Sequence, residues 1–224
     1  MMMTAVSQAK PVSRNYSLLL RFFAHFISWI FHPLFIPLYI TWFIAFVHTR
    51  YLTGYEDKFK WLLVIRVAVN MVIFPALTVL LLKAVGFISS VYLKAQRERI
   101  IPYITSGIFF FWMYLVFRNQ EFIPTVLTAF VFGVFLSSSA ALIVNIYQKI
   151  SMHAIGCGGL LGFLIMLSSD DAFYSIALPL SIALLITGLV CTSRLIISDH
   201  SNKEIYSGLF LGFICQILAG VIIS

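Results

Sequence analysis

Long apolar runs alternate with short polar segments along the whole chain, and this pattern predicts membrane-spanning helices. A helix needs about 20 predominantly apolar residues to cross the hydrocarbon core. Seven runs approach that length, at roughly 22–48, 61–85, 101–117, 122–146, from after His153 to about 167, 172–191 and 205–224. Because the runs are continuous rather than alternating, they predict helices and not a β-barrel. The expected fold is all-α, an integral membrane bundle of about six or seven transmembrane helices.

The start of the chain combines a polar, basic tail with an unusual first run. We expect residues 1–20 to form the tail and residues 21–224 to form one transmembrane domain. The run after the tail is too long for a signal peptide and lacks a small-x-small cleavage site, so we expect no removal. A polar stripe recurs in it at helical spacing, formed by Arg21, His25, Ser28 and His32. The stripe fits either a helix lying in the membrane interface or the first turns of a tilted span.

Composition and charge narrow the class of protein. The chain is 61% hydrophobic and 10% charged, with a mean hydropathy of +1.00, whereas a soluble domain is about a quarter charged. The net charge of +7 is scattered through short loops rather than gathered on a domain. That distribution indicates contact with anionic lipid headgroups, and we expect the lipid bilayer as a partner and no nucleic acid.

The small residues inside the runs are predicted to serve packing. Cys157, Cys191 and Cys215 lie in or at the ends of apolar runs without CxxC spacing, so we expect them to pack rather than react. Gly158 and Gly162 form a Gly-x-x-x-Gly pattern, which favours close approach of two membrane helices.

Three polar clusters are predicted to meet at one membrane face. Two runs separate Lys94–Arg99 from Ser151–His153, and two more separate Ser151–His153 from Arg194–Glu204. An even number of crossings returns the chain to the same side. The polar loop at 49–60 and two tight turns therefore belong to the opposite side.

The residue types in these clusters favour phosphate chemistry. The cations are Lys94, Arg97, Arg99, Arg194 and Lys203. The loop carboxylates Glu98, Asp199 and Glu204 include no close pair suited to Mg²⁺. Lysine and bidentate arginine can hold a phosphate directly, so we expect no metal and no cofactor.

Two serines and two histidines complete the predicted chemistry. Ser151 and Ser201 stand where helices would begin, so free backbone amides could add to an anion site. His153 and His200 would supply one acid and one nucleophile for phosphoryl transfer. A second interpretation stays open, because Ser201-x-x-Glu204 also has the form of a capping box, which needs no chemistry.

The clusters resemble the signature of the type-2 phosphatidic acid phosphatase superfamily, over about Val91 to Ser224. That signature reads Lys-x6-Arg-Pro, Pro-Ser-Gly-His and Ser-Arg-x5-His-x3-Asp. The matching positions here are Lys94 and Pro102, then Ser151 and His153, then Ser193, Arg194, His200 and, at the Asp position, Glu204.

The resemblance implies a role for each matching residue. His200 would be the nucleophile, Glu204 would orient it, and His153 would protonate the leaving oxygen. Lys94, Ser151 and Arg194 would bind the phosphate, and Arg97 or Arg99 could supply the guanidinium that the first motif lacks. Members of the superfamily typically dephosphorylate lipid phosphates at the membrane surface without a metal.

Four positions depart from the signature and keep other functions open. Ile101 replaces the arginine of the first motif, and Glu204 replaces the aspartate of the third. Ile150 and Met152 replace the proline and the glycine of the second motif. A catalytically weak or inactive protein that binds a lipid headgroup or a partner is therefore the alternative to a phosphatase. A transporter is disfavoured, because transport sites lie near the midplane and the runs hold few ionisable residues apart from His48, Arg66 and Lys83, near span ends.

Two arguments give opposite predictions for the side of the membrane on which the three clusters lie. On the motif side lie nine cations, Lys10, Arg14, Arg21, Lys94, Arg97, Arg99, Lys149, Arg194 and Lys203. On the other side lie four, Arg50, Lys58, Lys60 and Arg118. This count favours a cytoplasmic site, although four of the nine are candidates for phosphate. The resemblance instead implies a bacterial inner membrane with the site facing the periplasm.

Overall fold

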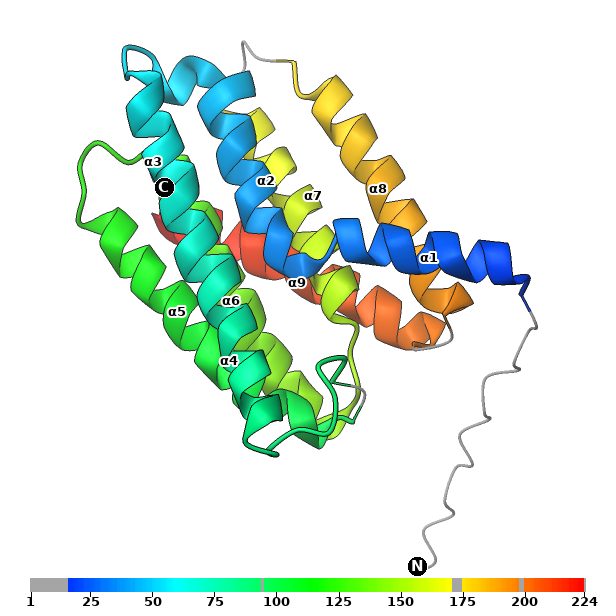
Figure 1. The fold of residues 1–224 in the computed structure, drawn as a ribbon. Coiled ribbons are helices and arrows are strands. Elements are labelled where there is room, and N and C mark those ends of the chain that lie inside the picture. Colours follow the sequence, from blue (N-terminus) through cyan, green and yellow to red (C-terminus); the bar gives the residue numbers. More distant parts are fainter. Residues whose placement is uncertain (1–15, 94, 171–174, 198–199, 224) are drawn as a thin grey trace, which may run out of the picture.

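The structure is a computed structural model that describes residues 16–93, 95–170, 175–197 and 200–223. Every regular element within these ranges is helical (Figure 1). The α-helices are α1 (Leu18–Ile30), α2 (Ile36–Trp42), α3 (Asp57–Val67), α4 (Phe74–Ala84), α5 (Ile100–Arg118), α6 (Thr125–Tyr147), α7 (Met152–Asp170), α8 (Ala177–Ile196) and α9 (Asn202–Ile223). Short 3₁₀- or π-helical segments are η1 (Pro33–Phe35), η2 (Phe43–Val47), η3 (Thr49–Leu52), η4 (Ala68–Ile73) and η5 (Arg97–Arg99).

Seven helical segments in the described part of the chain are long and apolar enough to cross a membrane. This confirms the predicted all-α membrane bundle. The segments are Leu18–Val47, Asp57–Ala84, Arg97–Arg118, Thr125–Tyr147, Met152–Ser169, Ala177–Ile196 and Asn202–Ile223.

Two helix boundaries differ from the predicted spans in a way that matters for the polar clusters. The sixth span was expected to end near residue 191, but α8 continues to Ile196 and carries Arg194 in its last turn. A cation there interacts favourably with the partial negative charge of the helix end. The seventh span was expected from 205, but α9 begins at Asn202.

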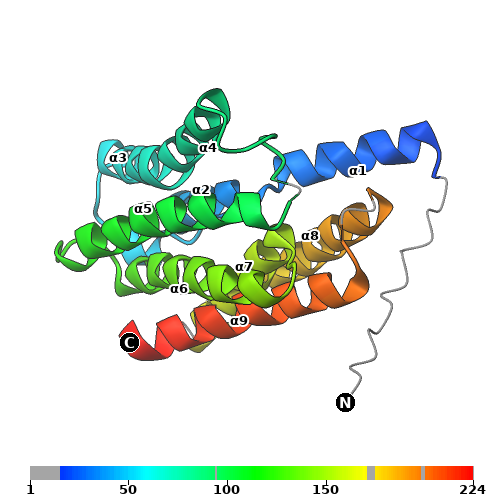
Figure 2. The same cartoon turned by 90° about the horizontal axis from the view of Figure 1, so that it is seen from below.

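The first apolar run is broken rather than straight. The helix α1 begins at Leu18, within the expected tail, where the Ser17 hydroxyl accepts the Leu20 amide hydrogen at 3.3 Å. It ends before His32 and Pro33, because proline lacks the amide hydrogen needed to continue the helix. As a result α1 turns away from α2 and crosses the C-terminal end of α8 (Figures 1 and 2). Of the predicted polar stripe, Ser28 faces inward and is buried.

Close backbone packing joins α7 to α9, as the glycine pattern predicted. A Cβ atom at Gly158 would overlap the backbone carbonyl of Leu209, and one at Gly162 would lie 2.9 Å from the carbonyl oxygen of Phe213. Gly212 makes the reciprocal approach to the carbonyl of Ile155. Since lipid tails are as apolar as leucine, such backbone proximity is a main source of attraction between membrane helices.

The packed core lies between α2, α3, α5, α6 and α7, away from the polar clusters. Among its fully buried side chains are Leu63, Phe117, Phe130 and Phe163. The helix α8 contributes little to this core, because it packs mainly against α7 and α1. The C-terminal ends of α6 and α8 and the N-terminal ends of α5, α7 and α9 lie toward the same end of the molecule (lower part of Figure 1). The described parts of the three polar clusters therefore lie at one end of the bundle.

Candidate functional site

A short, partly buried hydrogen bond between His200 and Glu204 lies at the start of α9. The His200 Nδ1 and Glu204 Oε2 atoms are 2.6 Å apart, and His200 is only 8% exposed. Because an ionised carboxylate can only accept, Nδ1 carries the proton in this bond. The second ring nitrogen, Nε2, is then the one with an available lone pair.

The helix start explains why these two residues face one another. The Ser201 hydroxyl accepts the backbone N–H of Glu204 at 3.4 Å, and the Ser201 carbonyl accepts the N–H of Ile205 at 3.1 Å. This is the serine half of a capping box. The Glu204 carboxylate, however, is hydrogen-bonded to His200, so the cap and the histidine–carboxylate pair coexist.

The surroundings of His200 keep its ring neutral. Burial, together with the positive charges of Arg194, Lys149 and Arg99, lowers the pKa of His200 to about 3. A neutral ring with its proton on Nδ1 has a free lone pair on Nε2 at neutral pH. That protonation state is the one a nucleophilic imidazole requires.

Ser151 ties the second cluster to the third. Its side chain is fully buried, and its backbone N–H donates to the carbonyl of Glu204 at 3.2 Å. Its hydroxyl accepts the N–H of Ala154 at 3.4 Å, at the start of α7. We expected Ser151 to mark a set of free amides, but its own amide is occupied by Glu204.

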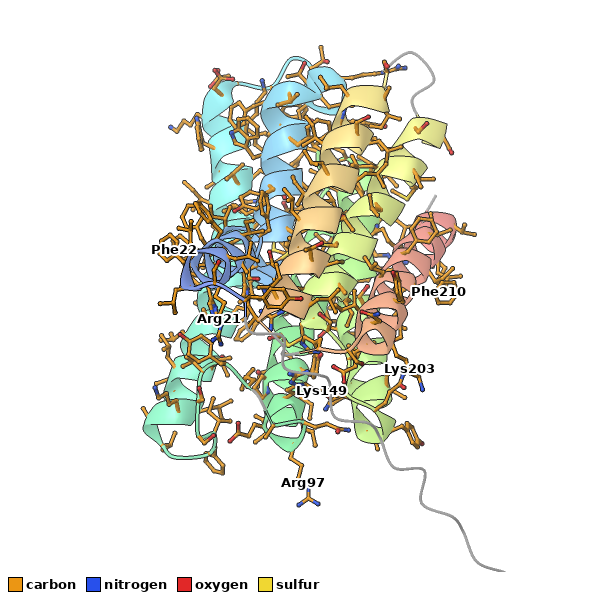
Figure 3. The ribbon with its side chains drawn as sticks, turned by 90° about the vertical axis from the view of Figure 1, so that its right-hand side faces the viewer. Arg21, Phe22, Arg97, Lys149, Lys203 and Phe210 are labelled. Atoms are coloured by element: carbon orange, nitrogen blue, oxygen red, sulfur yellow. The ribbon has the colours of Figure 1, made fainter. Side chains whose placement is uncertain are left out.

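The predicted arginines of the first cluster have different surroundings. Arg99 is 5% exposed, and its Nε and Nη1 groups donate to the carbonyls of Leu93 and Ile150 at 2.8 and 2.9 Å. Arg99 therefore links the first cluster to the residue before Ser151. Arg97 is exposed and points away from the bundle (Figure 3), so the structure does not bring it to this site. Lys94 lies outside the described residues.

Arg194 lies among three histidines. From the last turn of α8, its guanidinium is within electrostatic reach of the rings of His32, His153 and His200. We refer to these four residues and Glu204 as the histidine cluster. His153, Arg194 and Glu204 lie on α7, α8 and α9, while His32 lies two residues after the end of α1 and His200 two residues before the start of α9.

His153 is held by the first helix rather than by the neighbouring loops. Its Nε2 lies 3.0 Å from the backbone carbonyl oxygen of Ser28. The His32 ring meets the His153 ring edge to face, with centroids 5.2 Å apart. Because a carbonyl oxygen accepts, Nε2 of His153 carries a proton, and Nδ1 remains for other partners.

The sequence did not assign three residues that the structure brings to this site. Ser28 and His32 had been noted only as part of a polar stripe, and the stripe itself was the available signal. Lys149 had been counted as a loop cation, although it stands two residues before Ser151. In Figure 3 Lys149 lies near the middle of this end of the bundle, while Lys203 points outward.

The arrangement can present one neutral histidine nucleophile and several cations to an anionic group. Comparisons of this chain with protein families, with curated proteins and with solved structures find no match.

Proposed function

We propose that this protein is a membrane-embedded phosphatase that hydrolyses a lipid phosphate or lipid pyrophosphate through a phosphohistidine, without a metal. The observation that supports it most directly is the partly buried hydrogen bond of 2.6 Å between His200 Nδ1 and Glu204 Oε2. A carboxylate on Nδ1 orients the ring and stabilises the positive charge that the ring gains when Nε2 attacks. The sequence resemblance to the type-2 phosphatidic acid phosphatases points to the same residues.

The proposed reaction has two steps. In the first, the Nε2 lone pair of His200 forms a bond to phosphorus while the bond from phosphorus to the leaving oxygen breaks. The negative charge of a bound phosphate favours a second proton on His153. His153 gives this Nδ1 proton to the leaving oxygen, with Nε2–H held on the Ser28 carbonyl. In the second step, His153 takes a proton from a water molecule that attacks phosphorus. The P–N bond breaks, and inorganic phosphate leaves with His200 restored.

The charge of the phosphoryl group is met by fixed cations in this proposal. Arg194 provides a guanidinium, whose planar geometry suits phosphate oxygens. Lys149 provides a second positive charge near His200. Lys94, which matches the first motif, is the third proposed cation. Fixed positive groups in a partly desolvated site stabilise the transition state without reorganising.

A lipid substrate follows from the position of the cluster. The cluster lies at the ends of helices whose other surfaces are apolar and exposed, such as Leu184 and Leu185 on α8 and Phe210 on α9. A substrate with its phosphate at the membrane surface and its chain in the bilayer reaches such a site by lateral diffusion.

The test is release of inorganic phosphate by the detergent-purified protein with EDTA present. The panel holds phosphatidate, phosphatidylglycerol phosphate, a polyprenyl pyrophosphate and a lipid A phosphate. We expect the wild type to release phosphate from at least one lipid and His200→Gln to release none. Lys203→Gln is the control, because it removes an exposed positive charge at the same helix start, and we expect its rate to stay within twofold of the wild type. Equal release by wild type and His200→Gln rules the proposal out.

A second candidate is a protein that binds a lipid phosphate without turning it over. It is favoured by Met152, which occupies the motif's glycine position, and by the engagement of Arg99 with two backbone carbonyls. This candidate predicts no release from any lipid on the panel, together with binding of the lipid phosphate that weakens in Arg194→Ala. Turnover by the wild type excludes it.

We also propose, from the resemblance, that the site faces the periplasm across a bacterial inner membrane. The C-terminus of α9 then lies in the cytoplasm, because α9 runs away from the site. A green fluorescent protein fused after Ser224 should fluoresce in cells, whereas an active alkaline phosphatase fused at the same point would place the site in the cytoplasm.

A further inference from the structure

A mainly apolar groove of about 300 Å³ lies between α8 and α9. Its volume is at the lower end of the range for ligand cavities, roughly 300–1,000 Å³. One wall is made by Gly188, Cys191 and Leu195 of α8, and the other by Ile205, Tyr206 and Leu209 of α9.

The groove exists because α8 and α9 share α7 as a neighbour but otherwise pack on different helices. The helix α8 also packs against α1, while α9 also packs against α6. The C-terminal end of α8 lies near the start of α9, and the two helices then diverge (Figures 1 and 3). Gly188 widens the space further, because a Cβ atom there would have no heavy atom within 4 Å.

The groove begins next to the candidate site along both helices. Leu195 directly follows Arg194 on α8, and Ile205 directly follows Glu204 on α9. Thr187, Thr192 and Asn202 add polar groups to a lining that is otherwise apolar. On the membrane side the groove continues toward exposed apolar side chains, since Tyr206 and Phe210 are 69% and 68% exposed.

A charged site next to a mainly apolar groove matches an amphiphile that has a charged phosphate at one end and a hydrocarbon chain at the other. We infer that the groove between α8 and α9 holds the hydrocarbon chain of the lipid whose phosphate lies at the histidine cluster. The inference rests on the proposed phosphatase function and adds a specificity to it. The chain positions the phosphate for attack by His200, so long-chain substrates are preferred to water-soluble ones.

The test compares a long-chain phosphatidate with dihexanoyl phosphatidate, which is short enough to dissolve as a monomer. Gly188→Leu fills the groove from an open position and also favours helix, so the fold is retained. Thr192→Trp fills it from another lining position. Leu185→Trp is the matched control, because Leu185 is 65% exposed on the same helix outside the groove lining.

Each buried methylene contributes about 0.8 kcal/mol, so loss of two of them from the groove corresponds to roughly tenfold in affinity. We expect KM for the long-chain lipid to rise about tenfold in Gly188→Leu and Thr192→Trp. We expect turnover of the dihexanoyl lipid to stay within twofold, and Leu185→Trp to leave both substrates unchanged.

The other outcomes overturn the inference and differ from one another. Unchanged hydrolysis of both lipids by both groove variants shows that no substrate chain lies there. An equal loss on both lipids assigns the groove to packing. A change of oligomeric mass in Gly188→Leu, with unchanged turnover, assigns it to a second copy of the chain. Release from neither lipid by the wild type overturns the proposed function, and the inference with it.

Discussion

At the scale of single residues, the proposed chemistry depends on which nitrogen of His200 holds the proton. The Glu204 side chain is one methylene longer than the aspartate of the signature that the sequence resembles, yet its carboxylate reaches Nδ1 at 2.6 Å. It does so because Glu204 lies in the first turn of α9 and His200 just before that turn. The helix start therefore compensates for the longer side chain.

Two substitutions of Glu204 separate the effect of its negative charge from the effect of its side-chain length. Glu204→Gln keeps a hydrogen-bonding group of the same length but removes the negative charge that stabilises the ring during attack. We expect kcat for lipid-phosphate hydrolysis to fall by about 10²–10⁴-fold in Glu204→Gln. Glu204→Asp restores the charge and should retain more activity than Glu204→Gln. The reverse order of the two variants would contradict an electrostatic role for this carboxylate.

The lowered pKa of His200 also predicts a pH dependence of stability. An unfolded histidine has a pKa near 6.5, while that of His200 is lowered to about 3 in the fold. Between these values the unfolded chain binds more protons, so acidification destabilises the folded protein. We expect the fall in Tm between pH 7.5 and pH 5 to be smaller in His200→Gln than in the wild type. Thermal melts in detergent at the two pH values measure this fall in Tm. An equal fall in Tm in both proteins would show that the pKa of His200 in the folded protein is not lowered.

The sequence predicted part of this site. The spacing from Arg194 to His200 and Glu204 lies within one local segment, so the pattern alone could indicate that these residues meet. The contact of His153 with Ser28 joins residues 125 apart in the sequence, and it depends on how α1 crosses α8. The burial of Arg99 against two carbonyls also depends on tertiary packing, and residue spacing does not report it.

At the scale of the elements, the site depends on close contact between α7 and α9. Gly208 allows it at the site itself, because a Cβ there would lie 2.9 Å from the carbonyl oxygen of Ser151. The same approach lets the Ser151 amide reach the carbonyl of Glu204. The glycines of these helices therefore position the second cluster against the third.

Alanine substitutions test this packing with a built-in control. Gly212→Ala would drive a methyl group into the carbonyl of Ile155, whereas Gly188→Ala would place one in open space. We expect Gly212→Ala to lower Tm. Gly188→Ala should keep or raise Tm, because alanine is favoured over glycine in a helix by about 1 kcal/mol. Similar melting of the two variants would mean that α7 and α9 separate easily.

At the scale of the whole molecule, continuous apolar runs were enough to predict the class and the number of spans. The long runs fixed α5, α6 and α9 closely, since no alternative to a helix satisfies the backbone in lipid. The course of α1 could not be predicted. The stripe through Ser28 and His32 fitted both a tilted span and an interfacial helix. The break at Pro33 predicts that the helix ends there, but it does not predict the direction of α1 relative to the rest of the bundle.

The overall arrangement gives the histidine cluster two distinct supports. The helices α7 and α9 hold it rigidly through backbone contacts, while α1 and the end of α8 close it from the other side (Figure 2). The rigid pair carries His153 and Glu204, and His200 lies just before α9. The second pair carries Ser28 and Arg194, and His32 lies just beyond α1. The proposed phosphate site draws on both supports.

The most direct test of the central claim is to trap the phosphoryl group on the protein. Purified wild type is mixed with a ³²P-labelled lipid phosphate in EDTA, quenched in denaturant, and the labelled peptide is identified by mass spectrometry. The account predicts an acid-labile, alkali-stable label on His200, and no label in His200→Gln that elutes as a folded protein. Phosphate release without a covalent label, or a label on another residue, would contradict it.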